Sequence, residues 1–516
     1  MIVQRNLCLQ RPLAEGICQQ SSRWLSTTTL WCEQIVFGQS HPRSSEHNVQ
    51  RGSIDIDRNT GTITACHPGE DWSQAQARNP NGSQHLGSGK AAGTVLSPGW
   101  IDVHTHISAL GRNWEGYETA TMAAAAGGIT TLMGMPLNSI PSTTTLEAVE
   151  MEREQAAKER LFVDVGLWGG VVPGNLHQIH ELLESPCVFG LKAFLAPLPP
   201  AAGYEAVSPS QLLEAARICS PTGKPILVHS ELMTEEESLH MAEDSFAAAA
   251  DQSSYKAHLR SRPARWEQDA VQVVCQATRQ QQGDIVFTCR MHIVHLSDAR
   301  GCLPIIQSYK ERDSVKQEEP LLTVETCPHY LLLDESMIQD GDTRIKCFPP
   351  IRDAENRKLL WEGLENGLID MVASDHSPCE PHMRDMESRD LKTAWGGLSG
   401  LQYQLQATWT GAVERRRSIV DMANWWSVQP SRLAGLQRLK GQIAPGQQAD
   451  LCWWDPGHVG APNDYSQEYH RWKGTTYFAD KIDLRGRVLG TWVRGVKVYD
   501  GLRDEHGPPA GELLTC

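Results

Sequence analysis

Short apolar runs recur through the middle of the chain and alternate with amphipathic or alanine-rich segments such as 144–160 and 353–366. Eight of these runs have the length and composition of buried strands, and they cover residues 98–106, 128–135, 161–169, 188–194, 225–231, 290–297, 321–328 and 369–376. Strands that alternate with helices form parallel sheets, and eight is the number that closes a barrel. The pattern therefore predicts an α/β fold of the TIM-like (β/α)₈ barrel type.

Two segments with short strand-like pieces flank the barrel pattern. The first lies over 31–97, with a strand expected at 30–38 and pieces at 52–56 and 61–65, and the second lies over 441–516. Both segments are rich in strand-like pieces, but neither alone is convincing as a domain. We therefore predict that the two ends pair into one small β-sandwich. The predicted organisation is a leader over 1–30, the two sandwich segments, and a barrel over 98–440.

Two further stretches interrupt the regular pattern. An insertion over 232–289 contains the acid-rich residues 235–244, an alanine run and a helix expected at 266–281. The polar stretch 70–93 is rich in Gly, Asn and Ser and is predicted to be a flexible loop.

Composition excludes several classes of partner. The 516 residues carry a formal net charge of −15, which argues against nucleic acid and against an anionic membrane surface. No apolar stretch reaches the roughly 18–20 residues of a membrane span. The 14 cysteines form no C-x-x-C pair, so we expect reduced thiols in an intracellular protein. Arg5, Arg11 and Arg23 give the leader a weak targeting character; a cytoplasmic location is expected, with a mitochondrion or peroxisome as the alternative.

Ionisable residues recur at the C-terminal ends of the predicted strands, where barrel enzymes have their active sites. The first strand ends in His104 and His106, whose side chains lie on one side of a strand because its period is two. The fifth strand ends at His229, the sixth at His295 and the eighth at Asp375. Each residue alone is more readily explained as structural. Their recurrence at one end of the same barrel predicts a metal centre.

Lys192 lies inside the apolar fourth run, and two explanations are open. The side chain could extend to the surface and place its charge in water. Alternatively, burial would push it toward the neutral amine, which can take up carbon dioxide and become an anionic carbamate that bridges two metals. The residues alone do not decide between the two.

The complete set resembles the binuclear branch of the amidohydrolase superfamily, and in particular the cyclic amidohydrolases: dihydroorotase, hydantoinase, dihydropyrimidinase and allantoinase. This resemblance covers roughly 94–500. It implies that His104, His106 and Asp375 hold one divalent metal ion, that His229 and His295 hold a second, and that carbamylated Lys192 bridges them. Zinc is the expected metal, with Mn, Co and Fe as alternatives. Asp375 would accept a proton from the attacking water and return it to the leaving ring nitrogen. His292 and His376 are expected to support the ligands.

Within that group the loops resemble the allantoinases. Dihydroorotases carry an arginine where this chain has Ser108, and hydantoinases carry a tyrosine soon after the lysine, where this chain continues Phe194-Leu195-Ala196-Pro197. The stretches that carry the resemblance are GRNWEG (111–116), MPLNS (135–139), PST (141–143), SRP (261–263), WE (266–267), KCFPPIR (346–352), SDHSPC (374–379) and WGG (395–397). Two departures are the absence of an acidic residue near 108 and the proline-rich loop 196–207.

The resemblance implies hydrolysis of the hydantoin ring of allantoin to allantoate in purine breakdown. Allantoin is a small neutral molecule, so its pocket needs hydrogen-bonding groups, for which the candidates are Arg112, Asn138, Cys347, Ser377 and Gly397. Each of these residues could instead shape a loop. Two alternatives stay open, a hydantoinase or dihydropyrimidinase and a non-catalytic hydantoinase-like scaffold. A homo-oligomer, dimer or tetramer, is expected by family analogy alone.

Overall fold

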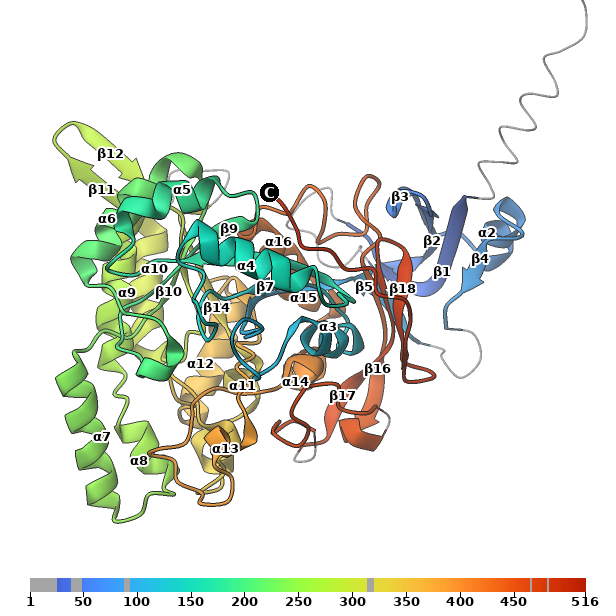
Figure 1. The fold of residues 1–516 in the computed structure, drawn as a ribbon. Coiled ribbons are helices and arrows are strands. Elements are labelled where there is room, and N and C mark those ends of the chain that lie inside the picture. The colour runs from blue at the N-terminus through green and yellow to red at the C-terminus, as the bar shows by residue number, and fades with distance from the viewer. Residues whose placement is uncertain (1–25, 39–48, 88–92, 313–319, 465, 480–481) are drawn as a thin grey trace, which may run out of the picture.

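The computed structural model describes residues 26–38, 49–87, 93–312, 320–464, 466–479 and 482–516 (Figure 1). Within these ranges one sheet contains eight parallel strands in the order β15-β14-β13-β10-β9-β8-β7-β6. The strands are β6 Trp100–Thr105, β7 Ile129–Gly134, β8 Asp164–Gly170, β9 Val188–Phe194, β10 Ile226–His229, β13 Met291–Ile293, β14 Leu322–Thr326 and β15 Met371–Val372. Seven lie inside predicted runs and β8 extends one residue beyond its run, to Gly170, so the predicted strands are confirmed.

The two outer strands of this sheet meet, which closes the barrel. A parallel bridge joins Thr105, at the end of β6, to His376, just beyond β15. The backbone N–H of His106 donates to the His376 carbonyl at 2.8 Å, and the N–H of Ser374 donates to Asp102 Oδ1 at 3.1 Å. The first and last strands are thereby held in register at the end that carries the predicted ligands.

Helices pack around the outside of the strands, as the alternation predicted. The helices of the repeating units are α3 Tyr117–Ala126, α4 Leu146–Ala156, α5 Ile179–Glu184, α6 Pro209–Cys219, α9 Arg265–Thr278, α10 Ala299–Arg312, α11 Pro328–Leu332, α12 Ala354–Glu365, α13 Pro381–Arg384, α14 Gln404–Glu414, α15 Ile419–Ala423 and α16 Gln429–Leu433. The apolar faces of most of these helices form one core cluster with side chains of the strands, such as Leu191 and Val228, whereas α16 contributes Leu433 to a second cluster. In α3 this face is alanine, which allows the helix to lie close to the sheet.

The insertion after β10 contains more structure than the sequence predicted. It forms α7 Glu235–Ala249 and α8 Tyr255–Arg260, and then α9. The predicted helix 266–281 is confirmed as α9, but its end is wrong because α9 stops at Thr278. The following residues form a hairpin, β11 Arg279–Gln282 and β12 Ile285–Thr288, in which Gly283 takes the positive φ of +60° that the turn requires.

The two ends of the chain pair in a second, nine-stranded sheet, as expected. Strand β5 lies antiparallel to β16 and joins the N-terminal strands to the C-terminal ones. The strands are β1 Thr27–Val36, β2 Val49–Asp57, β3 Thr62–Pro68, β4 Ser83–His85, β5 Val95–Pro98, β16 Leu451–Gly460, β17 Leu484–Val493, β18 Val496–Asp500 and β19 Glu505–His506. Figure 1 shows this sheet beside the barrel.

The prediction of a flexible loop over 70–93 is wrong for the described part of that stretch. Residues Trp72–Arg78 form helix α2, and β4 pairs with β1. The Trp72 ring stacks on His85 at 5.0 Å, and Arg78 is ion-paired with both Asp55 and Glu70. These contacts, with Asp55 and within the stretch itself, supply the order that the polar local sequence did not indicate.

Other expectations concern the ends and the thiols. Most of the predicted leader, residues 1–25, lies outside the described residues, whereas 27–30 belong to β1. The cysteines of the described ranges are free, as predicted. Within those ranges no helix has the length and apolar character needed to cross a membrane.

Candidate metal centre and active site

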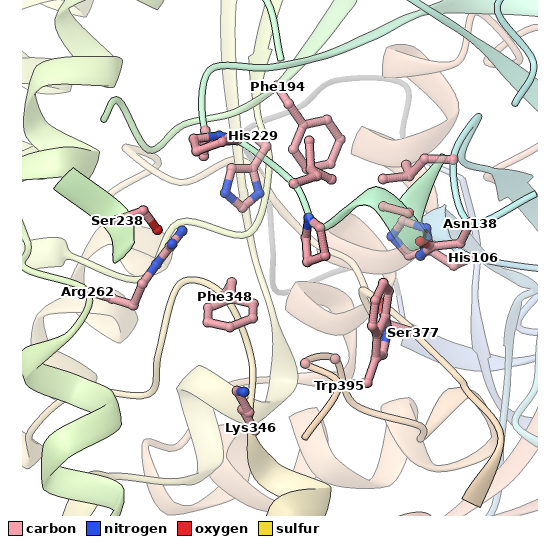
Figure 2. A pocket seen from close by; sticks show the side chains of 18 of the residues that line it. His106, Asn138, Phe194, His229, Ser238, Arg262, Lys346, Phe348, Ser377 and Trp395 are labelled. Carbon is pink, nitrogen blue, oxygen red and sulfur yellow. Dashed lines mark hydrogen bonds between the residues drawn. The ribbon is translucent and has the colours of Figure 1, made fainter. Parts of the chain in front are cut away.

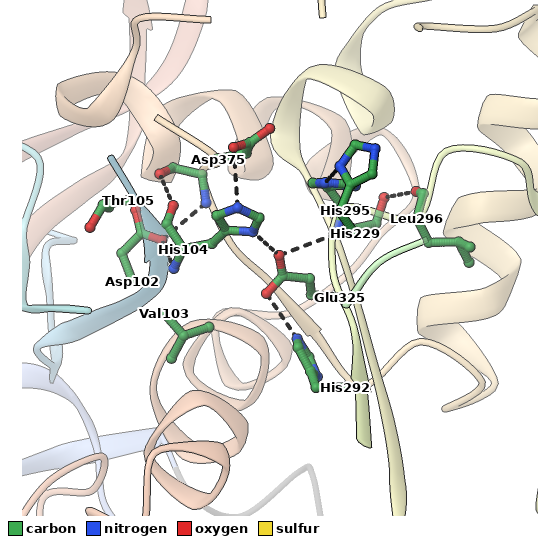
Figure 3. Close-up of polar contacts among 12 residues, drawn as sticks. Asp102, Val103, His104, Thr105, His229, His292, His295, Leu296, Glu325 and Asp375 are labelled. Carbon is green, nitrogen blue, oxygen red and sulfur yellow. Dashed lines mark hydrogen bonds and ion pairs between the residues drawn. The ribbon is translucent and has the colours of Figure 1, made fainter. Parts of the chain in front are cut away.

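Three predicted ligands converge where β6 meets the segment after β15, and Figure 3 shows two of them, His104 and Asp375. His104 Nε2 and His106 Nε2 lie 3.2 Å and 3.4 Å from Asp375 Oδ1. One donor atom from each residue lies within 4.8 Å of the others, and all three side chains are buried. Two imidazoles and a carboxylate at this spacing form a donor set suited to a divalent metal ion.

His229 and His295 form the neighbouring pair. His229 Nε2 donates to Glu231 Oε2 at 2.9 Å, so its Nδ1 presents a lone pair. That Nδ1 lies 2.9 Å from His295 Nε2, and the His295 and His104 rings are 5.4 Å apart. Two ring nitrogens that converge on one point, next to the first three ligands, fit a second cation.

The backbone turns sharply at two of these residues. His295 and Asp375 have φ values of +40° and +47°, a region that residues other than glycine rarely adopt. Strand β13 ends at Ile293, so the alternation of side chains along that strand does not decide where His295 points. The His295 backbone N–H and the His292 ring both contact Glu325. The positive φ turns the ligand, at a cost in strain that is typical of functional sites.

Lys192 extends into the same group from β9. The side chain is fully buried, and in the described structure its Nζ has no hydrogen-bond partner. Burial lowers the pKa of Lys192 to about 8, against the opposing effect of Glu325 and Asp375. An amine that is buried, unpartnered and more easily deprotonated has the properties that carbamylation requires. The explanation by a surface-exposed lysine is wrong, because the side chain does not reach water.

Glu325 on β14 is a functional residue that the sequence reasoning missed. Its carboxylate accepts from His104 Nδ1 at 2.5 Å, from His292 Nε2 at 3.0 Å and from the His295 backbone N–H at 3.2 Å (Figure 3). Burial would raise its pKa, but the charge and hydrogen bonds of His104 and His292 hold it well below the ordinary value. Glu325 thereby fixes His104 with Nε2 free to bind a metal. The feature of the sequence that could have indicated this role is a glutamate within an apolar strand.

A second support holds His229. Glu231 accepts from His229 and is ion-paired with Arg262, whose Nε lies 3.0 Å from Glu231 Oε1. The Arg262 guanidinium also lies over the Phe348 ring, at 4.8 Å from its centroid. Neither Glu231 nor Arg262 was singled out as a site residue, although Arg262 lies in the SRP stretch.

A cavity of about 530 Å³ opens above these residues (Figure 2). Four of the predicted histidines and Asp375 line its floor. The proline-rich loop 197–202 forms one wall, and α7 contributes Ser238 and Leu239 to the rim. Phe348, Trp395 and Gly396 form another wall. The volume suits a small ring compound whose reacting group lies over the histidines.

Three of the five substrate-binding candidates line this cavity. Asn138 lies 3.3 Å from His106 Nδ1 by its side-chain amide, and Ser377 Oγ lies 3.1 Å from Asp375 Oδ1. Gly397 has a φ of +124°, and a Cβ there would come within 2.5 Å of the Ser377 Cβ. Arg112 and Cys347 are not among the described residues that line the cavity.

Other contacts occupy those two residues. The Arg112 guanidinium donates to the Ala201 carbonyl and lies over the Trp114 ring. The Cys347 carbonyl accepts from His258 Nε2 at 3.1 Å. His376, the expected support of Asp375, is buried, with its Nδ1 accepting from the Gly400 N–H and its Nε2 3.4 Å from Glu115.

Comparison with known proteins agrees with this arrangement. Residues 95–498 match the sequence model of the amidohydrolase family, which is metal-dependent. The chain belongs to the amidohydrolase family. Its His104, His106 and Asp375 form a group that could hold one of the metal ions on which this family depends.

The chain is also similar to individual proteins whose activities are more specific than the family. The chain is 39% identical over 423 residues to a probable allantoinase of Oryza sativa subsp. japonica, covering 81% of this chain and 80% of that protein. It is 39% identical over 458 residues to an allantoinase of Arabidopsis thaliana, covering 87% and 85%. Among solved structures, the L-hydantoinase (dihydropyrimidinase) of Arthrobacter aurescens superimposes with a TM-score of 0.79 at 27% identity, covering 95% and 99%.

Proposed function

We propose that this amidohydrolase is an allantoinase, which opens the hydantoin ring of allantoin to give allantoate. The observation that carries the proposal is the 39% identity to allantoinases over more than four-fifths of the chain. The complete predicted ligand set at one end of the barrel supports it. The 27% identity to an L-hydantoinase supports the alternative of a hydantoinase only at the level of the family. The complete site argues against a non-catalytic scaffold.

The buried donors fit two divalent cations. His104, His106 and Asp375 would hold one, His229 and His295 the other, and Lys192 as its carbamate would reach both, with zinc the expected metal for nitrogen and oxygen donors. Bound there, the two cations would lower the pKa of a shared water toward neutrality and polarise the ring carbonyl. The buried Nζ of Lys192 has no hydrogen-bond partner in the described structure, which supports the assignment of Lys192 to the proposed metal ligands.

Asp375 is the residue placed to move the proton. Burial would raise its pKa, but His104, His106 and His295 hold it well below the ordinary value, so Asp375 is ionised, which is the form that can accept a proton. Ser377 Oγ, 3.1 Å from Asp375 Oδ1, orients that carboxylate. Asp375 then delivers the proton to the ring nitrogen as it leaves.

The cavity walls orient a neutral ring. The Asn138 amide offers a hydrogen bond close to His106, and the aromatic faces of Phe348 and Trp395 cover apolar surface. The proline-rich loop 197–202 adds further apolar surface to the cavity lining. A cavity with a few polar groups among aromatic and apolar side chains suits a small ring compound such as allantoin.

A substrate panel tests this proposal. Purified protein supplied with zinc or manganese would be assayed with allantoin, unsubstituted hydantoin, dihydrouracil and dihydroorotate. We expect the highest kcat/KM for allantoin. Turnover of dihydrouracil without turnover of allantoin would replace the proposal by a dihydropyrimidinase, and a protein that binds metal but opens none of these rings would favour the scaffold.

Metal content tests the proposed ligand set independently of activity. We expect two equivalents of metal per chain in the wild type by plasma mass spectrometry, and fewer in Lys192→Ala. Two retained equivalents in Lys192→Ala would exclude the lysine as a bridging ligand. Carbamylation would be read as an added mass of carbon dioxide on Lys192 under native conditions. A homo-oligomer stays a prediction.

A further inference from the structure

Lys346 extends toward the end of the cavity that the proposed mechanism does not use. It follows the short helix Thr343–Ile345 and lines the same cavity as His104 and Asp375. Only 4% of its surface is exposed. Figure 2 shows its amine beyond the Phe348 ring, on the far side of that ring from His229.

The hydrogen bonds of Lys346 leave one donor unused. Its Nζ donates to the carbonyl of Lys392 at 3.1 Å and to that of Ala394 at 2.5 Å. An ammonium has three N–H groups, so one has no oxygen acceptor in the described structure, where the centroid of the Phe348 ring lies 5.5 Å from Nζ. No carboxylate of the described residues is ion-paired with Lys346. In contrast, Arg262, the other buried cation of the cavity, is already paired with Glu231.

A second buried cation makes the same wall more positive. Arg384 is fully buried behind the wall and donates to the carbonyls of Gly397 and Ser377, the latter at 3.1 Å. Lys346 and Arg384 therefore hold the wall segment 394–397 from two sides through neutral carbonyls. Two cations without buried counter-charges create a potential that favours an electron-rich oxygen on the ligand.

We propose that Lys346 is a specificity-determining residue, whose free N–H donates to the carbonyl oxygen of the ureido substituent on the hydantoin ring. This inference rests on the proposed allantoinase function. With the ring amide over His104 and Asp375, the substituent is the part of the substrate that can extend along the wall toward Lys346. Unsubstituted hydantoin has no such oxygen and leaves the ammonium without its third partner.

The test compares two substrates in two proteins. kcat/KM would be measured for allantoin and for unsubstituted hydantoin with the wild type and Lys346→Met. We expect the preference for allantoin over hydantoin to fall about 10- to 100-fold, the usual effect of a hydrogen bond to a charged donor. Lys358→Met, at an exposed position of α12, is the matched control and should leave both values unchanged.

Each other outcome decides against the inference. An equal loss for both substrates would mean that Lys346 only holds the 392–397 segment, and no loss for either would mean that it touches neither the ring nor its substituent. If Lys346→Met does not fold, Lys346→Gln, which keeps a donor for the carbonyls but not the charge, replaces it. A wild type that opens hydantoin but not allantoin would refute the proposed function itself, whereas an active wild type with an unchanged preference in the variant refutes only the role of Lys346.

Discussion

Glu325 contacts three histidines of the site at once and is the residue on which the two halves of the proposed metal centre both depend. Glu325→Gln keeps the size of the side chain but removes the charge and one acceptor. We expect about a 10- to 100-fold loss of metal affinity, because His104 and His292 lose the carboxylate that fixes their ring nitrogens. Metal titration by calorimetry or with a competing chelator measures the metal affinity of the two proteins.

The matched control for that variant is Glu355→Gln, a glutamate with an exposed side chain on α12. It should bind metal as the wild type does. Unchanged metal affinity in Glu325→Gln would contradict the role of Glu325 as the support of His104.

Lys346 gives a second prediction, in the pH dependence of substrate preference. Burial lowers its pKa to about 7, and the charged or titratable groups that face it are Asp390, Arg262, Arg384 and His258. Burial lowers the pKa of His258 to about 3, so its ring stays neutral near pH 7. Lys346 is protonated below pH 7, so the preference for allantoin over hydantoin should fall about tenfold as pH rises from 6 to 8.5.

The ratio of kcat/KM values for the two substrates measures this effect, because titration of the shared metal site cancels in it. Lys346→Met should flatten the profile. A preference that is constant across this range in the wild type would show that the charge of Lys346 does not contribute to recognition.

At the residue scale, the sequence was sufficient to predict which side chains come together on one cavity as the proposed metal ligands. His104, His106, His229, His295 and Asp375 stand at strand ends, which the apolar pattern locates. It was not sufficient for the groups behind them, because Glu325 meets His104 across 221 positions of the chain. Arg112 and Cys347 were predicted to bind substrate from loop motifs alone, and a motif does not determine where its side chains point.

Among the elements, the wall segment 394–397 depends on a glycine. Gly397 has a φ of +124°, and an added Cβ would meet the Ser377 Cβ at 2.5 Å. Gly397→Ala should therefore displace Ser377 from Asp375, and we expect it to lower the free energy of unfolding by about 1–3 kcal/mol and kcat/KM for allantoin by at least about tenfold. Urea unfolding and steady-state kinetics measure the two effects.

Gly367→Ala is the control for this variant. Gly367 also has a positive φ, +72°, but nothing lies within 4 Å of its added Cβ. It should share part of the loss of stability and keep the activity. If both variants lost activity equally, backbone strain alone would account for the effect and the contact with Ser377 would be irrelevant.

The elements themselves were predictable where the local pattern and the tertiary contacts agree. The eight barrel strands are apolar runs and are buried on both faces, so their signal was strong. Helix α2 was missed because its order comes from Trp31, His85 and Asp55, which lie elsewhere in the chain. The end of α9 was placed three residues too late because the hairpin that follows it begins with residues that also suit a helix.

At the scale of the whole molecule, a buried charge network joins the barrel to the second sheet. Lys440 Nζ lies 2.6 Å from Asp164 Oδ2, at the start of β8, and also contacts Asp450, just before β16. Arg494 lies 2.7 Å from Asp164 Oδ1. Lys440→Met would leave two buried carboxylates short of a partner, and we expect it to lower the free energy of unfolding by about 3–5 kcal/mol.

Chemical denaturation measures that loss, with the exposed Lys358→Met as the control. Burial would raise the pKa of Asp164, but Lys440 and Arg494 hold it below the ordinary value. Its contribution to stability is therefore present above the pKa of an unfolded aspartate, about 4, and is lost as pH falls below it. A Lys440→Met variant as stable as the wild type would contradict the importance of this network.

The pairing of segments that lie far apart in the chain could be predicted only in outline. Strand count and the β-rich character of both ends predicted a barrel and a second sheet built from the two ends. The sequence did not say that β5 pairs with β16, or that residues 511–514 return to lie beside Val165 of β8. Such pairings depend on which surfaces are left uncovered once the barrel has formed.

The most direct test of the account is the hydrolysis of racemic allantoin by purified protein supplied with zinc or manganese and bicarbonate, with Lys192→Ala assayed beside it. We predict ring opening to allantoate by the wild type and its loss in the variant. Metal-loaded wild type that leaves allantoin intact, or a Lys192→Ala variant as active as the wild type, would contradict it.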